Sequence, residues 1–356
     1  MSTVGTPAHS WTAVIFDLMS GQTLPASATA WAMGEIMDGA ATDVQVAGYA
    51  VALRSKGETP AEVDGMVSAM LDRALPMPLS EELRAAAVDT CGTGGDRSGT
   101  VNISTMAAIV VAAAGIPVVK HGNRAATSRA GSADLLEALG VVIDLQPAGV
   151  AQCVREVGIG FCFAPRFHPA LRHAATARSQ LGVPTVFNML GPLTNPARVS
   201  RQAVGVAQSW LGPVLAGVLA RRDSSALVFH GDDGLDELTP GARSHVWVVV
   251  DGEIIEDVVD PAELGLPSAS LDDLRGGDAD HNAVVAREVL GGGGSPAARA
   301  AVELNAAAAL VAAQGTTREP VTDQLRPALA RAHEVLASGA ALTLLERWAE
   351  VSQQQS

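Results

Sequence analysis

The sequence predicts an α/β fold in which a small α-helical domain precedes a large α/β domain with a mostly parallel, mixed central sheet. Three observations predict it. Residues 11–75 carry only helical patterns. After Ser80, short β-branched runs alternate with helical stretches, which is typical of parallel strands with helices on their faces. A late hairpin signal adds antiparallel strands. We place the small domain at residues 1–80 and the large domain at residues 81–356.

Capping signals divide the helical part. Thr42 opens a capping box that ends at Gln45, and Gly57 terminates the helix that follows it. A second capping box begins at Thr59, with proline at the first helical position. A proline-rich linker at residues 76–78 closes this part of the chain.

The large domain is expected to contain six strands before its hairpin. They are predicted at residues 88–91, 116–119, 141–145, 159–163, 204–206 and 226–229, and helices at 105–114, 132–139, 169–181, 296–313 and 324–348. Residues 246–250 and 254–259 flank Asp251 and Gly252, a pair typical of a type I′ turn.

Composition limits the classes of function. The 356 residues are 48% hydrophobic and carry a net charge of −14, so a basic surface for non-specific nucleic-acid binding is absent and no nucleic-acid partner is expected. Cys91, Cys153 and Cys162 have no metal-ligand spacing and suit a reducing compartment. No membrane-spanning run or signal peptide is recognisable, so we expect a cytoplasmic protein.

Three turns rich in Gly, Ser, Thr and Asn lie between residues 89 and 134. Free N–H groups in such turns bind anions, and three of them this close together indicate a bound polyanion. The turn at residues 92–96 lacks the spacing of a dinucleotide fingerprint and the Gly-Lys-Ser/Thr ending of a Walker A loop. It either holds a phosphate or diphosphate or is a tight strand-to-helix turn.

Two other features of this stretch allow two interpretations each. Asn102 or Ser104 either caps a helix or, together with neighbouring hydroxyls, binds phosphate or a metal. Lys120 is either a surface side chain or a phosphate clamp. Since Lys56 is the only other lysine and 22 of the 24 basic residues are Arg, a lysine at this position favours the clamp. His121 is expected to be structural.

Asp236 and Glu237 are adjacent carboxylates behind two glycines. They are either an exposed acidic turn or ligands of Mg²⁺, which prefers oxygen ligands and bridges to substrate phosphates. No Ser/His/Asp triad and no zinc spacing emerges, and we assign no catalytic acid or base. A phosphate cradle, a lysine, carboxylates and Arg178 on a second basic helix suit displacement of diphosphate.

Together these stretches resemble the anthranilate phosphoribosyltransferase family, from about residue 11 to the last helix. The matching motifs are Lys56-Gly57-Glu58-Thr59-Pro60, Gly92-Thr93-Gly94-Gly95-Asp96, Asn102-Ile103-Ser104-Thr105, Lys120-His121-Gly122-Asn123-Arg124, residues 131–140, residues 187–196 and residues 233–238. Thr127 and Ala130 stand where the family often has serines, and Ala130 loses the hydroxyl.

The resemblance implies a reaction that joins the amine of anthranilate to C1 of 5-phosphoribosyl 1-diphosphate (PRPP) with inversion, releasing diphosphate. This is the second step of tryptophan biosynthesis from chorismate. It also implies Mg²⁺ as cofactor, an oxocarbenium-like transition state, helices from about residues 168–195 that join the small domain, and a homodimer formed through that domain.

The resemblance also implies site residues, carried over motif by motif. Those implied for PRPP are Gly92, Gly95, Asp96, Thr100, Asn102, Ile103, Ser104, Thr105, Lys120, His121, Gly122, Asn123, Arg124, Ala125, Ala126, Thr127, Ser128 and Ser132. Those implied for anthranilate are Gly92, Asn123 and Arg178, with His121, His168 and Pro169 lining the acceptor tunnel. Ser104, Asp236 and Glu237 are implied as magnesium ligands.

Two other functions share parts of this pattern. A pyrimidine nucleoside phosphorylase-like enzyme has the same fold, but residues 120–124 and the Asp236-Glu237 pair favour the anthranilate enzymes. A non-catalytic paralogue that binds nucleic acid would keep the glycine turn and need a basic surface, which the charge of −14 does not favour.

Overall fold

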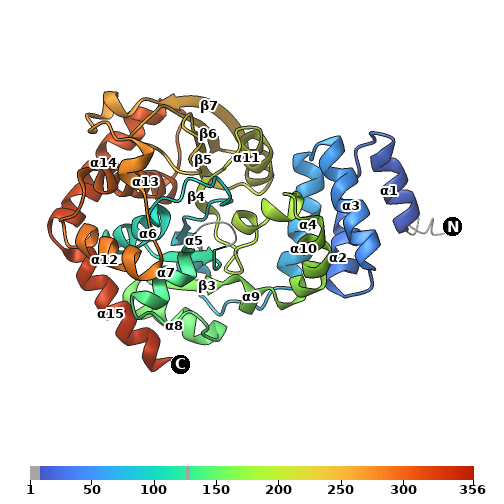
Figure 1. Ribbon diagram of the computed structural model, residues 1–356, viewed down its shortest axis with the longest axis horizontal. Helices are drawn as coiled ribbons and strands as arrows, with labels where there is room; N and C mark the ends of the chain where they lie inside the picture. The colour runs from blue at the N-terminus through green and yellow to red at the C-terminus, as the bar shows by residue number, and fades with distance from the viewer. Residues whose placement is uncertain (1–8, 126–128) are drawn as a thin grey trace.

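The computed structural model describes residues 9–125 and 129–356 and shows two parts side by side (Figure 1). A small helical domain contains the first four helices, and a larger α/β domain contains the sheet. Ala126, Thr127 and Ser128, which the resemblance implies for PRPP, lie outside the described residues. No helix among the described residues is both long and apolar enough to span a bilayer.

The small domain begins with four helices whose ends follow the predicted caps. They are α1 (Trp11–Met19), α2 (Ala26–Met37), α3 (Asp43–Lys56) and α4 (Pro60–Asp72). Both capping boxes form, at Thr42 with Gln45 and at Thr59 with Glu62. The later helix α10 (Ala175–Leu181) packs on α3, and a 3-10 helix at Pro169–Ala174 packs on α2.

A seven-stranded mixed sheet forms the centre of the large domain. Its order is β3-β2-β1-β4-β5-β6-β7, with the first five strands parallel and the last two antiparallel. The strands are β1 (Val88–Asp89), β2 (Val118–Gly122), β3 (Ile159–Phe163), β4 (Arg201–Gly205), β5 (Ser225–Gly231), β6 (Ser244–Val250) and β7 (Glu253–Val259). The predicted type I′ turn is confirmed, because Asp251 and Gly252 both have positive φ.

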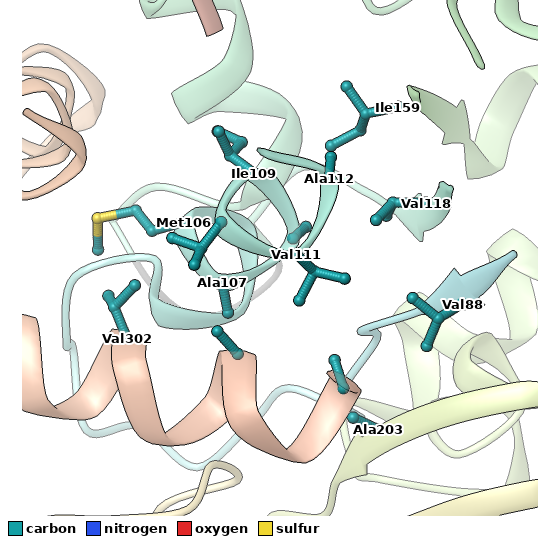
Figure 2. Packing of buried hydrophobic residues seen from close by; sticks show 14 of the residues in the cluster. Val88, Met106, Ala107, Ile109, Val111, Ala112, Val118, Ile159, Ala203 and Val302 are labelled. Atoms are coloured by element: carbon teal, nitrogen blue, oxygen red, sulfur yellow. The ribbon is translucent and has the colours of Figure 1, made fainter. Parts of the chain in front are cut away.

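The helices of the large domain cover both faces of this sheet. They are α5 (Glu81–Ala86), α6 (Ile103–Ala113), α7 (Ser132–Ala138), α8 (Pro147–Val157), α9 (Ala164–Phe167), α11 (Leu211–Arg221), α12 (Ala279–Leu290), α13 (Pro296–Gln314), α14 (Val321–Ala337) and α15 (Ala340–Gln354). Figure 2 shows Met106 and Ala107 of α6 near Val302 of the Ala-rich α13. Small side chains let these two buried helices pack closely.

The protein has two hydrophobic cores, one within the large domain and one shared between the two domains. Along β4, Ala203 belongs to the core beneath α6 and α13, whereas Val204 belongs to the core that also contains α11 and the helices of the small domain. Leu227 and Val228 of β5 alternate in the same way, as side chains of a strand must. The small domain therefore packs on one face of the sheet through α11.

Three of the predicted elements differ from the structure. Residues 141–145 form no strand, because this apolar run lies outside the sheet and leads into α8, which begins with Pro147. The helix predicted at residues 324–348 is two helices, since Gly339 adopts a left-handed conformation between α14 and α15. The helix at residues 169–181 starts as a 3-10 helix.

The sheet topology places the functional motifs at one edge. The chain runs outward from β1 to β2 and β3 on one side, and to β4 and β5 on the other. Ligands of such sheets bind at the carboxyl ends of the strands where this order reverses. The glycine turn follows β1, residues 120–124 end β2, and Asp236 and Glu237 follow β5.

Candidate active site

A cleft of about 390 Å³ opens at this edge, between the glycine turn and the segment that includes α9, α10 and residues 187–194. It brings together almost all the described residues that the sequence singled out. They are Gly92, Gly95, Asp96, Thr100, Asn102, Ile103, Ser104, Thr105, Lys120, His121, Gly122, Asn123, Arg124, Ala125, Ser132, His168, Arg178, Asp236 and Glu237. Pro169 follows His168 but does not line the cleft.

The glycine turn is part of a long loop over residues 90–102, which excludes a tight strand-to-helix turn. Gly94 and Gly95 have φ of +65° and +88°, a backbone that other residues rarely adopt. The Gly94 N–H donates to Oδ2 of Asp236 at 2.7 Å. A Cβ on Gly92 would lie 2.9 Å from the same oxygen, so glycine is needed where the turn meets this carboxylate.

The two acidic residues are partly buried and held by backbone N–H groups, which excludes an exposed acidic turn. The Ser104 N–H donates to Oε1 of Glu237 at 3.1 Å. Burial raises the pKa of both carboxyls, and the neighbouring carboxylate adds to it, Asp96 for Asp236 and Asp236 for Glu237. Because burial and mutual repulsion disfavour the ionised carboxylates, a cation bound by both of them would stabilise the pair.

Magnesium fits these residues if a substrate supplies the other ligands. Among the described residues, no cluster of three or more His, Cys, Asp or Glu side chains is arranged to hold a metal alone. Mg²⁺ is commonly held by one or two carboxylates plus substrate phosphates and water. Asp236, Glu237 and the Ser104 hydroxyl therefore match a site completed by a diphosphate.

Lys120 is buried in the middle of β2, so it is not a surface lysine. Its Nζ donates to the backbone oxygen and the hydroxyl of Thr90 and reaches the Ser104 hydroxyl at 3.5 Å. Asp89, also fully buried, lies below it and accepts from the backbone N–H of His121. The ammonium is thereby fixed beneath the glycine turn.

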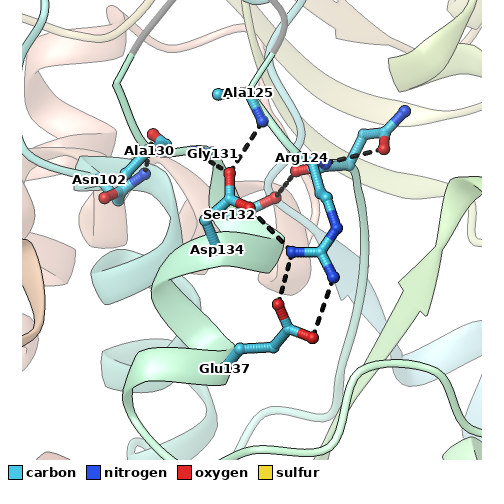
Figure 3. Close-up of polar contacts among 9 residues, drawn as sticks. Asn102, Arg124, Ala125, Ala130, Gly131, Ser132, Asp134 and Glu137 are labelled. Carbon is cyan, nitrogen blue, oxygen red and sulfur yellow. Dashed lines mark hydrogen bonds and ion pairs between the residues drawn. The ribbon is translucent and has the colours of Figure 1, made fainter. Parts of the chain in front are cut away.

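Asn102 occupies the N-cap position of α6, but its side chain does not cap the helix, so the capping interpretation is wrong. Its Nδ2 donates to the Ala130 oxygen at 3.0 Å, as Figure 3 shows, and its Oδ1 accepts from Asn282 of α12 at 3.0 Å. The amide joins the first and last turns of the glycine-rich stretch. Ser104 does not cap α6 either.

Arg124 is engaged by carboxylates of α7 on the rim of the cleft. Its guanidinium lies between Asp134 and Glu137 (Figure 3), with Nη1 2.9 Å from Oδ1 of Asp134 and Nη2 3.0 Å from Oε1 of Glu137. The second oxygen of Asp134 accepts from the N–H groups of Ala125 and Gly131. Arg124 therefore braces the turn that leads into α7.

Two buried histidines line the cleft with their ring centroids 5.2 Å apart. Nδ1 of His121 donates to the Gly191 oxygen, and Nε2 of His168 donates to the Thr194 oxygen, because a carbonyl can only accept. The other nitrogen of each ring is an unprotonated acceptor without a partner among the described residues. Burial lowers both pKa values, that of His121 to about 3, so both rings are neutral.

Arg178 is the cation on the opposite wall. It lies half-buried on α10 with its guanidinium carbon 5.5 Å from the centre of the Phe187 ring. Burial lowers its pKa, and the described part of the chain supplies no carboxylate partner. A planar guanidinium without a protein partner suits a carboxylate on a ligand.

Sequence reasoning missed the side chains that hold the motifs in place. Asn195 donates to the Oδ2 of Asp89 at 2.8 Å and to the Val119 oxygen at 2.7 Å. Asn305, on α13, bonds both the N–H and the oxygen of Leu238. Asn195 lies in the motif at residues 187–196 and Asn305 in an Ala-rich helical pattern, and neither pattern identifies the distant partner of the amide.

Comparison with known proteins covers nearly the whole chain. Residues 12–74 match the helical bundle domain, and residues 84–342 the a/b domain, of the glycosyl transferase family. The chain is 55% identical to an anthranilate phosphoribosyltransferase of Salinispora arenicola and 54% identical to that of Saccharopolyspora erythraea, with 97% and 98% of both chains covered.

Solved structures show the same similarity. A crystal structure of anthranilate phosphoribosyltransferase from Thermus thermophilus aligns with a TM-score of 0.88 and 42% identity, over 96% of this chain and 99% of that one. The Saccharomyces cerevisiae enzyme in complex with PRPP and Mg aligns with a TM-score of 0.85 and 27% identity, over 97% of this chain and 98% of that chain.

Proposed function

This chain belongs to the anthranilate phosphoribosyltransferase family, and we propose that its cleft binds PRPP and anthranilate in the manner set out below. The enzyme transfers the phosphoribosyl group of PRPP to the amine of anthranilate. The products are N-(5-phosphoribosyl)anthranilate and diphosphate, in a step of tryptophan biosynthesis.

One observation carries the assignment of the two substrates to the two walls. The glycine turn and Lys120 form an anion site on the wall built from β1 and β2, and Arg178 provides a cation on the wall built from α10. A polyanionic donor fits the first wall, where the glycine-rich backbone and the ammonium of Lys120 line the same part of the cleft. An acceptor with one carboxylate fits the second.

The donor half would use the residues that the sequence singled out. The backbone of Gly92 and Gly95 and the side chains of Thr100, Asn102, Ser104 and Thr105 would bind the diphosphate and ribose. Lys120 would exchange its bonds to Thr90 for phosphate oxygens. The rim residues Asn123 and Ser132 would contact the phosphoribosyl end.

Magnesium would be held by Asp236, Glu237 and Ser104 next to the diphosphate. The yeast relative solved with PRPP and Mg supports this cofactor. The metal, when bound, supplies positive charge that stabilises the departing diphosphate. Burial and the neighbouring carboxylate raise the pKa of both carboxyls, and a bound cation would stabilise their ionised forms.

The acceptor half would orient anthranilate for attack on C1. Arg178 would pair with the carboxylate, and Asn123 and the backbone of Gly92 would line the same space. The unprotonated nitrogens of His121 and His168 are acceptors, which complement the two N–H bonds of an aromatic amine. Another yeast relative, 26% identical, was solved with 4-fluoroanthranilate.

The reaction needs positioning more than proton transfer. The amine nitrogen uses its lone pair to form the bond to C1 while the bond from C1 to the diphosphate oxygen breaks on the opposite face, which inverts C1. An aromatic amine is neutral at pH 7, so no base is needed before attack. The nitrogen then loses a proton, which can pass to water. Both histidines are neutral and would orient anthranilate rather than carry this proton.

We also propose that residues 1–80 and helices of residues 168–195 act as one small domain that forms a homodimer. The support is the packing of α10 on α3 and an apolar patch on α1 and α3, which Phe16, Met19, Val44 and Val51 expose. A cytoplasmic location remains our expectation, and the three cysteines are all free and buried.

The decisive experiment follows anthranilate fluorescence in a mixture of purified protein, PRPP and MgCl₂. We expect the fluorescence to decay and the decay to stop when EDTA removes the metal. A folded protein that leaves anthranilate unchanged would contradict the assignment. Phosphate-dependent cleavage of uridine or thymidine would then favour the phosphorylase alternative, and binding of single-stranded DNA the non-catalytic one.

A further inference from the structure

Arg54 and Trp210 form a contact between the two domains beside the cleft. Arg54 lies in the last turn of α3, and its guanidinium carbon is 3.7 Å from the centre of the Trp210 ring. The buried carboxylate of Glu58 holds the same guanidinium from the other side, with Nη1 and Oε2 3.2 Å apart. This geometry is a cation–π contact in which an ion pair also holds the arginine.

Trp210 belongs to the short loop between β4 and α11, and this loop hydrogen-bonds to the glycine turn. Its Nε1 donates to Oε1 of Gln208 at 2.6 Å. One residue earlier, the Ala207 N–H donates to the Thr93 hydroxyl at 3.0 Å, and the Thr93 N–H donates back to the Gly205 oxygen at 2.9 Å. The loop is thus hydrogen-bonded to both the hydroxyl and the backbone N–H of Thr93, which lies in the glycine turn.

Gly205, where β4 meets this loop, packs tightly against the backbone of Asp236. A Cβ at Gly205 would lie 1.6 Å from the backbone oxygen of Asp236, so the end of β4 lies directly against the carboxylate loop. A shift of residues 205–210 therefore displaces both the glycine turn and Asp236. The donor half of the cleft is mechanically connected to Trp210.

The acceptor half is connected to the other end of the same contact. Helix α3, which carries Arg54, packs on α10 and on the 3-10 helix Val186–Asn188. These two segments carry Arg178 and Phe187. The placement of α3 thereby sets both the guanidinium proposed for the acceptor carboxylate and the aromatic ring beneath it.

We propose that Trp210 is a positioning residue that, through Arg54, couples the acceptor half of the cleft to the donor half. This inference rests on the proposed function. Each substrate, by fixing its own wall, favours the arrangement of α3 and residues 205–210 that the other substrate requires. PRPP and anthranilate then bind with positive cooperativity, although neither touches Trp210 or Arg54.

The test is a matrix of initial rates over both substrate concentrations, for the wild type, Trp210→Ala, Arg54→Gln and the double variant. In the wild type, we expect the KM of each substrate to fall as the other increases. Each single variant should lose this dependence, with KM at saturating partner raised by about two- to thirty-fold, the range that one cation–π contact allows. The double variant should be no worse than either single variant.

Two matched controls separate coupling from general loosening of the domains. Arg221→Gln removes another arginine that crosses the same interface, 3.8 Å from Asp64, at the far end of α11 from residues 205–210. It should leave both KM values unchanged. Trp210→Phe keeps an aromatic face and should retain part of the coupling.

Three results would overturn the inference: substrate affinities that are independent of each other in the wild type, a folded Trp210→Ala with wild-type cooperativity, or additive losses in the double variant. If Trp210→Ala fails to fold, Arg54→Gln decides. If the wild type does not consume anthranilate, the proposed function fails first. The thermal midpoint then decides: we compare the rise on adding PRPP, MgCl₂ and anthranilate together with the rises from PRPP with MgCl₂ and from anthranilate alone. The same excess in wild type and Arg54→Gln rejects the coupling.

Discussion

Single side chains in this protein divide the cleft by charge. Lys120 and the N–H groups of the glycine turn make one wall attractive to a polyanion, and Arg178 makes the other attractive to a carboxylate. Asp236 and Glu237 contact the glycine turn and the start of α6 on the first wall, where their carboxylates call for a cation when a polyanion binds.

Arg178→Ala should mainly weaken the use of anthranilate. Loss of one member of a buried charge-assisted pair costs about 2–4 kcal/mol, which corresponds to a rise in KM of about 30- to 1,000-fold. The KM of PRPP should change little. Steady-state kinetics with each substrate varied separately checks this, and a defect limited to PRPP would remove Arg178 from the acceptor site.

Replacing Asp236 and Glu237 together by Ala should abolish magnesium-dependent turnover, because the metal loses both carboxylate ligands. The variant should still fold, since the two carboxylates oppose each other in the metal-free protein. Magnesium titrations of activity and of the thermal midpoint check both statements. Full activity in the double variant would place the metal elsewhere.

His121 should contribute to acid sensitivity. Its pKa is lowered to about 3 by burial, whereas in the unfolded chain it is near 6.5, so the unfolded state binds more protons between these values. Stability should therefore fall as the pH decreases from about 6.5 toward 3, by up to about 1.4 kcal/mol per pH unit. His121→Gln should show a smaller loss of thermal midpoint over this window than the wild type. Equal losses in both proteins would show that the buried ring is not responsible.

At the scale of elements, the large helix α13 supports the carboxylate loop from below. Asn305 pairs with both backbone groups of Leu238, directly after Glu237, and also bonds its own helix at Ala301. The side-chain amide of Asn305 therefore fixes the backbone directly after the carboxylate loop of Asp236 and Glu237. In this Ala-rich helix, Asn305 is the side chain that bonds the carboxylate loop.

Asn305→Ala should lower stability by about 1–3 kcal/mol, because the N–H and the oxygen of Leu238 would remain buried without partners. It should also raise the magnesium concentration needed for half-maximal rate. Denaturant unfolding and a magnesium titration measure the two effects. Asn282→Ala, which loosens α12 against Asn102 instead, is the comparison variant. Unchanged magnesium dependence in Asn305→Ala would show that the loop holds its position without this amide.

At the scale of the whole molecule, the two domains share a core through α11, and the small domain exposes several large apolar side chains. Phe16 and Met19 on α1 are 68% and 76% exposed, and Val44 on the neighbouring α3 is 81% exposed. Exposed apolar side chains on neighbouring helices support the homodimer interface proposed above. A second copy of the chain is the partner that the resemblance implies.

Phe16→Glu should therefore convert a dimer into a monomer, because burying an unpaired carboxylate in an apolar interface is unfavourable. Light scattering after size-exclusion chromatography measures the mass. Val284→Glu changes a valine of similar exposure on α12 in the large domain and should leave the dimer intact. A wild-type protein that is monomeric at micromolar concentration would refute the proposal.

The sequence by itself determined the local structure and the ligand class. Capping boxes at Thr42 and Thr59, the type I′ turn at Asp251 and the glycines of the anion-binding turn depend on neighbouring residues, so their signals are complete within a few positions. Strand–helix alternation was sufficient for the mostly parallel sheet. The run at residues 141–145 misled because a short apolar stretch does not reveal whether it joins a sheet.

Only the tertiary structure decided how distant residues act on one another. The amides of Asn102, Asn195 and Asn305 find partners 28, 106 and 67 residues away, and no local pattern specifies such pairs. The same holds for Arg54 and Trp210, which meet because α11 packs against α4. The physical reason is that periodicity and capping reflect neighbours along the chain, whereas burial, pKa shifts and contacts between domains depend on which segments the fold brings together.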